Sequence, residues 1–492
     1  MIPPYYTISI MPKYSFLLAV FVLILSLTIF FNRGFSYYDE GFILHAAERI
    51  VSGEIPYRDF DFIYTPGTIF LVALGFKLFG ESILVGRVLT MSVAILTALL
   101  IYFVTNRITK NKLLSFFSLL VYLSWGPMHI NFPWPTLFAL STGLLSTFFL
   151  STTLMGSLDS KKSSLGMTNA FLAGMMAFVT FLFKQNLGMA VLLSSLLSLI
   201  IVRKAKMKSL IVLALGVFMA FAVFLTYLLL TKSTKSFIDN FYFYTVKTVL
   251  LDQAFATDFP KGLKSLIYLF PGLVSLASLI FVYRNKKNYI HLPLFTLFFY
   301  LFGIRPTTDF VHLVLPMASI GIPLSLILLK AKQKIFVYGL FLSIIVSGFY
   351  TGLWKNYYRW DSSLIKQTYF IEDPRTRILV DQKFNRVIPE VLTFISGKSK
   401  KSDNIFVFYN AAMFYFLSER KNPTRYINFS PDLSLGGSRE KGVINNLKEK
   451  NVKIVLTHES PDRWGNPLIT KFILKNYQKK KEIFEFAIWE KK

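Results

Sequence analysis

SLIVLALGVFMAFAVFLTYLLL, residues 209–230, carries no charge and is long enough to cross a membrane as one α-helix. A hydrocarbon core about 30 Å thick requires about 20 apolar residues, because an α-helix rises about 1.5 Å per residue. Directly before this run stand Arg203, Lys204, Lys206 and Lys208. A basic cluster beside an apolar helix marks the end that stays in the cytoplasm. We therefore predict a transmembrane helix here, with its N-terminal end inside.

Similar apolar runs recur through residues 1–353 and predict about eleven transmembrane helices in an α-helical polytopic membrane protein. The chain of 492 residues is 53% hydrophobic and 16% charged, with a mean hydropathy of +0.50. The first run, 14–31, follows Lys13 and lacks a small-residue cleavage site after it, so we interpret it as an uncleaved helix. The other predicted spans are 84–104, 113–125, 135–155, 168–183, 187–202, 209–230, 263–283, 290–304, 311–329 and 335–353.

Basic clusters fall at every second connection between these spans, as the positive-inside rule requires. The clusters are Arg107, Lys110 and Lys112; Lys161 and Lys162; Arg203 to Lys208; Arg284, Lys286 and Lys287; and Lys330, Lys332 and Lys334. This alternation places residues 32–65, 231–262 and 354–492 outside. It requires that 66–80 does not cross, and about fifteen residues that include Lys77 are short for a span. We predict that 66–80 is re-entrant or interfacial.

The tail, residues 354–492, predicts a small extracytoplasmic α/β domain that follows the transmembrane domain of 1–353. Strand patterns occupy Asn404–Tyr409, Arg425–Phe429, Val452–Thr457 and Ile483–Trp489, and helical patterns occupy 411–419, 438–450 and 466–478. Alternation of strands and helices favours a largely parallel sheet. Residues 361–397 are predicted as a helical connector.

Composition excludes several classes of function. The formal net charge of +27 is spread over short clusters between apolar runs, so nucleic-acid binding is not predicted. The absence of cysteine excludes disulfides, thiolate metal sites and cysteine nucleophiles. The five histidines show no metal-ligand spacing, and no phosphate-binding glycine loop or nucleophile elbow occurs in a supporting context. No internal repeat is seen, which weighs against transporter folds built from inverted repeats.

Acidic residues gather in the predicted outer loop 32–65, whereas the spans are nearly free of charge. Asp39 and Glu40 begin a stretch with apolar residues at helical spacing that ends at Gly53, which predicts an amphipathic helix in the interface. Amide groups and the helix dipole at its N-terminus favour an ionised carboxylate, and such a group can take a proton from a hydroxyl. A helix cap is the alternative for Asp39, and on residue type alone it is the more frequent one.

Other polar residues on the predicted outer side could bind substrate. They are Tyr57, Arg58 and Asp59 in the first loop, Lys184 in a tight turn, and Arg305 with His312 near the last spans. The first three suit a carbohydrate or headgroup site, with solvated charge as an equal alternative. Arg305 could hold a phosphate, or could form a structural pair with Asp309. Lys184 could instead be a snorkelling surface lysine. Trp125 and Trp134 could stack on sugar, although interfacial aromatics are the default interpretation.

An ordered pattern in the first loop resembles the polytopic GT-C glycosyltransferases. The similar branch is the one related to protein O-mannosyltransferases and lipid A aminoarabinose transferases (glycosyltransferase family 39-like). The pattern consists of Asp39-Glu40-Gly41, Ala46-Ala47, Gly53, Pro56-Tyr57-Arg58-Asp59-Phe60, Pro66-Gly67, Lys77-Leu78-Phe79-Gly80 and Arg87. It spans about fifty residues and is specific as a whole, although each piece alone is weak. The segment from Arg305 to Pro316 is more loosely similar to a basic-then-proline segment near the last helices of that family.

The resemblance implies an inverting transfer of a sugar from a polyprenyl-phosphate donor to an acceptor hydroxyl on the outer face of the plasma membrane. Asp39 matches the aspartate expected to act as general base, and Glu40 would be its supporting acid. A cation must offset the departing lipid phosphate, and the candidates are Lys184 and Arg305, with Arg58 behind them. Not every branch requires a metal, so we assign no metal ligands, and a divalent cation stays open. The acceptor is a lipid, a protein or a polysaccharide.

Other functions also require many spans. A polytopic transporter or a flippase for lipid-linked sugars is the main alternative, but it would be expected to place charges or broken helices at mid-membrane, where few occur. An oligosaccharide polymerase would be expected to carry large outer loops with basic residues late in the chain. A purely structural scaffold is the third alternative, and only the loop pattern speaks against it.

Overall fold

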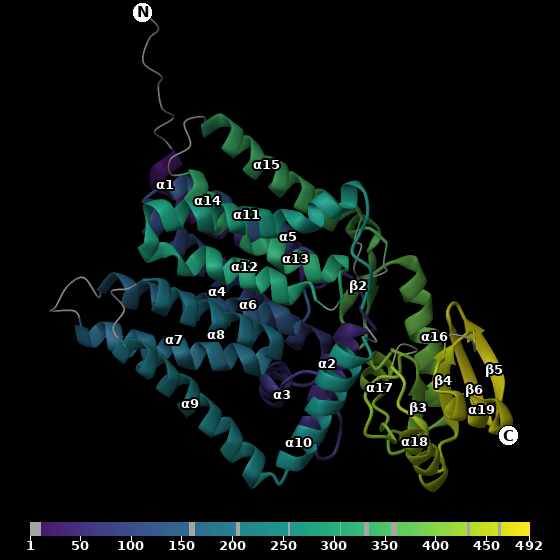
Figure 1. The fold of residues 1–492 in the computed structure, drawn as a ribbon. Coiled ribbons are helices and arrows are strands. Elements are labelled where there is room, and N and C mark those ends of the chain that lie inside the picture. The colour runs from purple at the N-terminus through teal and green to yellow at the C-terminus, as the bar shows by residue number, and fades with distance from the viewer. Residues whose placement is uncertain are drawn as a thin grey trace, which may run out of the picture.

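The computed structural model describes residues 11–156, 163–202, 207–253, 256–305, 307–328, 334–355, 362–430, 433–460 and 464–492. Long helices form a bundle, and the C-terminal domain lies at one end of it (Figure 1). Part of the predicted charge alternation falls outside the described residues and stays a prediction. This part comprises Lys161, Lys162, Arg203, Lys204, Lys206, Lys330 and Lys332.

The bundle is built from the apolar runs of the sequence. Its helices are α1 (Met11–Phe30), α4 (Ile83–Thr109), α5 (Lys112–Trp125), α6 (Pro135–Gly156), α7 (Ser163–Phe183), α8 (Gln185–Ile201), α9 (Met207–Leu230), α11 (Leu263–Asn285), α12 (His291–Gly303), α13 (Phe310–Ser319), α14 (Gly321–Leu328) and α15 (Lys334–Tyr350). The helix α7 packs against α6, α8 and α9, and α8 also packs against α12. The prediction of an α-helical polytopic membrane protein is confirmed.

Five described helices are long and apolar enough to cross a membrane: Ile83–Thr109, Pro135–Leu154, Gly166–Phe183, Met207–Leu230 and Leu263–Asn285. The pair α13 and α14 would make a sixth span, bent by 40° at its break. At this bend Gly321 lies against α5, where an added Cβ would come within 2.7 Å of the Cα of Ser118. Several other predicted spans correspond to shorter apolar helices, such as α5 and α8. The count of about eleven spans therefore stays a prediction.

Shorter helices lie near the end of the bundle that faces the C-terminal domain (Figure 1). They are α2 (Asp39–Val51), α3 (Gly67–Phe79), α10 (Thr234–Phe241) and the π-helix η2 (Tyr242–Leu251). The helix α3 is 13 residues long, about 20 Å at 1.5 Å per residue, and it packs against α2, α4 and α7. It is therefore short for a span, as the sequence of 66–80 predicted.

The C-terminal domain holds a four-stranded sheet and four helices. The strands are β3 (Ile405–Phe408), β4 (Ile454–His458), β5 (Tyr477–Ile483) and β6 (Phe486–Lys491), in the order β3-β4-β6-β5. The helices are α16 (Gln382–Lys398), α17 (Met413–Ser418), α18 (Gly437–Glu449) and α19 (Pro467–Asn476). Only β3 and β4 are parallel, because β4 pairs antiparallel with β6, and β6 with β5. The prediction of a largely parallel sheet is wrong.

Three predicted elements of the tail also differ from the structure. The apolar run Arg425–Phe429 is not a strand; its backbone pairs elsewhere, for example with the amide of Asp61, which donates to the carbonyl of Arg425 at 2.9 Å. The strand predicted at Ile483–Trp489 is a hairpin of β5 and β6, whose lysine-rich first strand lies at the sheet edge, where charged residues are common. The connector 361–397 contains a small hairpin, β1 (Tyr369–Ile371) and β2 (Ile378–Val380), before α16.

The first loop and the C-terminal domain share one hydrophobic core, which includes Phe60, Phe384 and Phe416. A Cβ on Gly41 of α2 would lie 2.4 Å from the backbone nitrogen of Met413, so only glycine fits there. The residues that follow Asp39 therefore pack directly against the C-terminal domain.

Ion pairs fasten the C-terminal domain to the first loop at both ends. Arg375, between β1 and β2, pairs with Glu48 at 2.5 Å and also with Glu81. Arg425 pairs with Asp61 at 2.7 Å. The loop is therefore held by its own helices on one side and by the tail on the other.

Candidate active site

A buried ion pair anchors the N-terminal turn of α2. Both carboxylate oxygens of Glu40 accept hydrogen bonds of 2.7 Å from the guanidinium of Arg87 in α4, and both side chains are fully buried. Arg87 also donates to the carbonyl oxygens of Arg33 and Gly34, at 3.1 and 2.8 Å. Because these bonds fix the chain just before α2, they also fix the position of Asp39. Glu40 thus acts on the neighbouring backbone and is enclosed away from solvent.

The Glu40–Arg87 pair leads to a stability prediction. We expect Glu40→Gln to lower the free energy of unfolding by about 3–5 kcal/mol, because it leaves a buried guanidinium without its counter-charge. Thermal unfolding in detergent measures the loss. Glu54→Gln is the matched control, since Glu54 pairs with Arg49 but is 38% exposed and should cost far less. An equal loss in both variants would show that the buried pair has no special role.

Asp39 is the first residue of α2 and is half-buried. The cap position belongs to Tyr38, and no side chain makes a cap hydrogen bond there. The carboxylate of Asp39 sits in the first turn of α2, where the helix dipole favours negative charge. Its roles as a general base and as a capping group both stay predictions.

Lys184 lies in the tight turn between α7 and α8 and is only 5% exposed. Its ammonium donates to the hydroxyl of Thr136 at 2.8 Å. It also lies 5.7 Å from the ring centre of Tyr64 and 5.6 Å from that of Trp134, at cation–π distance. Burial lowers the pKa of Lys184 to about 8, against the opposing effect of Asp309 and Asp39. The alternative of a snorkelling surface lysine is wrong.

The end of the first loop is fastened beside Lys184. The hydroxyl of Thr65 donates to the carbonyl of Phe181 at 2.5 Å, in the last turn of α7. Gly67, at the start of α3, approaches α7 so closely that a Cβ would lie 2.7 Å from the carbonyl oxygen of Leu182. These contacts explain how the adjacent Tyr64 reaches the lysine.

Asp309 and His312 come from the segment that begins α13. One carboxylate oxygen of Asp309 caps the helix by accepting from the amide of His312 at 2.9 Å, and it lies 2.7 Å from the Nδ1 atom of the same residue. Burial would raise the pKa of Asp309, but the contacts with His312 and the charge of Lys184 outweigh it and lower that pKa. Arg305 is exposed, and in the described residues Asp309 pairs with His312 rather than with Arg305.

Asp39 acts electrostatically on the same groups as Asp309. Burial raises the pKa of Tyr64, and the charges of Asp39 and Asp309 add to that rise. The charges of Asp39 and Asp309 also act to raise the pKa of Lys184, against the effect of burial. Lys184 thus lies beside the rings of Tyr64 and Trp134, and the charges of Asp39 and Asp309 act on it. These residues come from the first loop, from the α7–α8 turn and from the positions just before α6 and α13. We refer to Asp39, Tyr64, Trp134, Lys184 and Asp309 as the polar cluster.

Tyr57, Arg58 and Asp59 form a tight turn of their own. Arg58 binds both carboxylate oxygens of Asp59 at 2.9 Å, and the amide of Ile55 donates to Asp59 at 2.8 Å. Tyr57 is 1% exposed, and its hydroxyl donates to the carbonyl of Tyr64 at 2.9 Å. The structure thus places Tyr57 behind the polar cluster, while Arg58 and Asp59 neutralise each other.

A second group of side chains lies beside Asp39, on the side of the C-terminal domain. The hydroxyls of Tyr38 and Tyr409 are 2.5 Å apart, and the ring of His458 lies 5.0 Å from that of Tyr409. Tyr409 follows β3 and His458 ends β4, so both stand at the carboxyl ends of the two parallel strands. Crevices beside the carboxyl ends of strands are frequent ligand sites in open α/β sheets.

Sequence reasoning missed the parts of the cluster that depend on contact. Nothing in the sequence indicates that Thr136 contacts Lys184, because the two residues are 48 positions apart in the chain. Tyr64 lies in the predicted outer loop 32–65, where its residue type predicts no specific role, and the sequence suggests Asp309 only as a partner of Arg305. Within the part of the chain that the structure describes, no group of three or more His, Cys, Asp or Glu side chains is placed to hold a metal ion.

Comparisons with known proteins find solved structures with the same fold but no related sequence. No family model matches the chain, and no curated protein sequence matches it. The structure is similar to that of ArnT from Cupriavidus metallidurans bound to undecaprenyl phosphate, with a TM-score of 0.57 and 10% identity over 97% of this chain and 98% of that one. The apo form of ArnT gives a TM-score of 0.61, with 10% identity over 96% and 97%.

An archaeal protein has the same architecture. The oligosaccharyltransferase AglB from Archaeoglobus fulgidus, in complex with an inhibitory peptide and a dolichol phosphate, gives a TM-score of 0.51 and 11% identity over 98% of this chain and 75% of that one. At such identities the likeness concerns the fold. The chain therefore has the GT-C fold of membrane glycosyltransferases, as the pattern in its first loop implied.

Proposed function

We propose that this protein is an inverting glycosyltransferase that moves a sugar from a polyprenyl-phosphate donor to an acceptor hydroxyl on the outer face of the plasma membrane. The observation that carries the proposal is the polar cluster, in which the buried ammonium of Lys184 lies at cation–π distance from Tyr64 and Trp134. The charge of Asp39 in the first loop acts on Lys184 and Tyr64. The fold adds support, because solved structures with this fold hold undecaprenyl phosphate or dolichol phosphate.

In this proposal Lys184 holds the phosphate of the donor. Its ammonium is already positioned by Thr136 and by two aromatic rings, so little reorganisation is needed when charge develops on the leaving group. A buried cation also attracts a phosphate more strongly than an exposed cation does, because water screens its charge less. Arg305, exposed before α13, is the second candidate cation, and His312 orients Asp309 at the start of that helix.

Asp39 is the general base of the proposed reaction. Its carboxylate takes the proton of the acceptor hydroxyl, whose oxygen attacks C1 of the sugar on the face opposite the phosphate. The bond from C1 to the phosphate oxygen breaks, and polyprenyl phosphate leaves with the bonding electrons, so the configuration at C1 inverts. Positioning the two reactants converts a bimolecular encounter into a displacement between neighbours. Glu40 is a positioning residue here, since Arg87 occupies both of its oxygens.

The acceptor would approach from the C-terminal domain. Tyr38 precedes Asp39 directly, and it joins Tyr409 and His458 in the second group of side chains. Aromatic faces and hydroxyls suit a sugar or a lipid headgroup, because they offer stacking and hydrogen bonds together. The chemistry leaves the acceptor as a lipid, a protein or a polysaccharide.

The buried lysine predicts a pH dependence. Transfer should fall as the pH rises through about 8, because Lys184 loses its proton and no longer offsets the phosphate. Lys184→Arg keeps its charge at higher pH, so its alkaline limb should move upward even if its maximal rate is lower. The pH profile of kcat/KM for both proteins is the measurement. A wild-type profile that is flat through 8, or an unshifted limb in the arginine variant, would contradict this role.

The outer-face orientation can be tested cleanly because the chain has no cysteine. Single cysteines at Ser402 of the C-terminal domain and at Lys287 after α11, both exposed, lie on predicted opposite sides of the membrane. We expect a membrane-impermeant maleimide to label Ser402→Cys on intact cells, and Lys287→Cys only after permeabilisation. The reversed pattern would place the polar cluster on the cytoplasmic side.

The proposed activity is tested directly with purified protein and a panel of polyprenyl-phosphate sugars. The expected result is release of polyprenyl phosphate together with an equal amount of glycosylated acceptor. A transporter or flippase would instead move labelled solute or lipid across vesicle membranes without transfer. Such movement, with no transfer from any donor of the panel, would overturn the proposal in favour of that alternative.

A further inference from the structure

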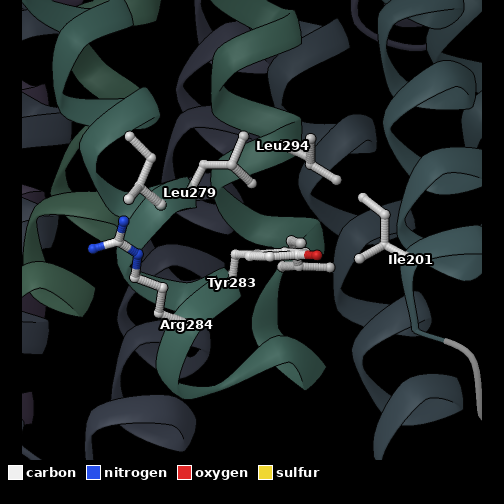
Figure 2. Close-up of a pocket in the computed structure, with 7 residues that line it drawn as sticks. Ile201, Leu279, Tyr283, Arg284 and Leu294 are labelled. Carbon is white, nitrogen blue, oxygen red and sulfur yellow. The ribbon is translucent and has the colours of Figure 1, made fainter.

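A groove of about 400 Å³ opens between α8, α11 and α12, away from the polar cluster. Figure 2 shows Ile201, Leu279 and Leu294 around the ring of Tyr283, with the guanidinium of Arg284 at one side. Ile201 ends α8, and Lys184 directly precedes its first residue, so the groove lies about 25 Å from Lys184 along a helix that rises about 1.5 Å per residue. It is therefore a separate site.

The rim of the groove is purely cationic. Arg284 lies in the last turn of α11, Lys286 and Lys287 come directly after the helix, and no acidic residue occurs in the sequence between Asp258 and Asp309. In the described residues none of the three cations forms an ion pair. Lys287 instead lies 4.5 Å above the ring centre of Tyr283, which lines the groove. Apolar walls beside unpaired positive charge suit an amphiphile with an anionic head.

The groove continues a lipid-facing surface. One face of α11 exposes large apolar side chains at a spacing of three and four residues, which is the period of a single helix face. These residues are Leu266, Leu269, Leu273, Leu276, Ile280 and Tyr283. A helix that is long and apolar enough to cross a membrane presents such a face to hydrocarbon. The groove thus opens from the hydrocarbon region and ends at the charged interface.

We propose that this groove binds an anionic phospholipid, with one acyl chain between α8, α11 and α12 and with the phosphate on Arg284. Lys286 and Lys287 add to the attraction, as basic clusters at the cytoplasmic end of transmembrane helices do for anionic lipid headgroups. A second copy of the chain is a poor occupant, because a symmetric contact would bring the same three cations face to face. The proposal does not depend on the sugar-transfer activity.

Native mass spectrometry of the full chain in detergent, titrated with phosphatidylglycerol or phosphatidylcholine, tests the site. We expect tighter retention of phosphatidylglycerol, a loss of about fivefold in its affinity in Arg284→Gln, and a larger loss when Lys286→Gln and Lys287→Gln are added. Lys264→Gln is the matched control, since Lys264 is exposed at the opposite end of α11. Leu279→Trp, which fills the groove, should lower retention of both lipids.

Several outcomes would overturn the proposal. They are equal retention of the two lipids by the wild type, an equal loss in Lys264→Gln, or a dimer that dissociates in Leu279→Trp. Because the groove is far from the polar cluster, these variants should keep sugar transfer in detergent. Loss of lipid preference with intact transfer therefore separates this site from the proposed activity, whereas absent transfer with intact lipid preference would count only against the activity.

Discussion

Replacing Asp39 with Asn is expected to lower sugar transfer by about 10²–10⁴-fold, the usual contribution of a general base. The amide has nearly the same shape as the carboxylate but cannot take the proton of the acceptor hydroxyl. The first turn of α2 should stay in place, because Arg87 holds Glu40 and the preceding backbone independently of Asp39. Donor affinity should therefore change little, while the rate of transfer from bound donor collapses.

Asp59→Asn is the matched control for Asp39→Asn. It lies in the same loop and loses a carboxylate of the same kind, but its partner is Arg58 rather than the polar cluster. We expect transfer within a few-fold of the wild type. Full transfer in Asp39→Asn would refute the role of the base, and a comparable loss in both variants would mean that the loop as a whole, rather than one carboxylate, supports activity.

Replacing Lys184 with Met is the second large effect that we expect. Methionine fills a similar volume but removes the charge that offsets the departing phosphate, and loss of one preorganised electrostatic group commonly costs about 10²–10³-fold in kcat. Donor affinity should fall as well, because the phosphate is charged in the ground state. The folded protein should survive, since Lys184 is 5% exposed and a buried apolar side chain is tolerated there.

This effect is measured by comparing the kinetics of Lys184→Met with those of the control variant Lys247→Met. Lys247 lies in η2 and is exposed, so its loss changes the surface charge of the protein without changing the polar cluster. We expect near wild-type kinetics from that control. If donor affinity and kcat were unchanged in Lys184→Met, Lys184 would not belong to the site. Arg305 would then be the remaining candidate for binding the phosphate.

The membrane helices follow closely from the sequence where one apolar run makes one straight helix. The run 209–230 became α9 (Met207–Leu230), and 84–104 became α4 (Ile83–Thr109). Hydropathy alone does not show that 311–329 breaks into α13 and α14. Pro323, which has no amide to donate to the carbonyl of Ser319, lies at this break, as does Gly321, which packs against Ser118. In the tail, the strand β5 could not be predicted, because its lysines are typical of a solvated loop and its pairing with β6 is not visible in the sequence.

For the candidate site, residue type and predicted location single out Asp39, Lys184 and the segment around Asp309. These groups stand out because charge is rare beside apolar spans. Sequence alone could not separate them from Arg58 and Asp59, which have equally suitable chemistry but satisfy each other locally. Nor could it place Trp134 and Thr136 around the lysine, because helix packing alone brings α6 to the α7–α8 turn.

Photocrosslinking of a polyprenyl phosphate that carries a photoreactive group beside its phosphate tests the central claim most directly. Peptide mass spectrometry should find the label on the segments around Trp134 and Lys184, and an excess of unmodified polyprenyl phosphate should suppress it. Label confined to the groove near Tyr283, or label at Lys184 that competitor does not suppress, would contradict the assignment of the polar cluster as the donor site.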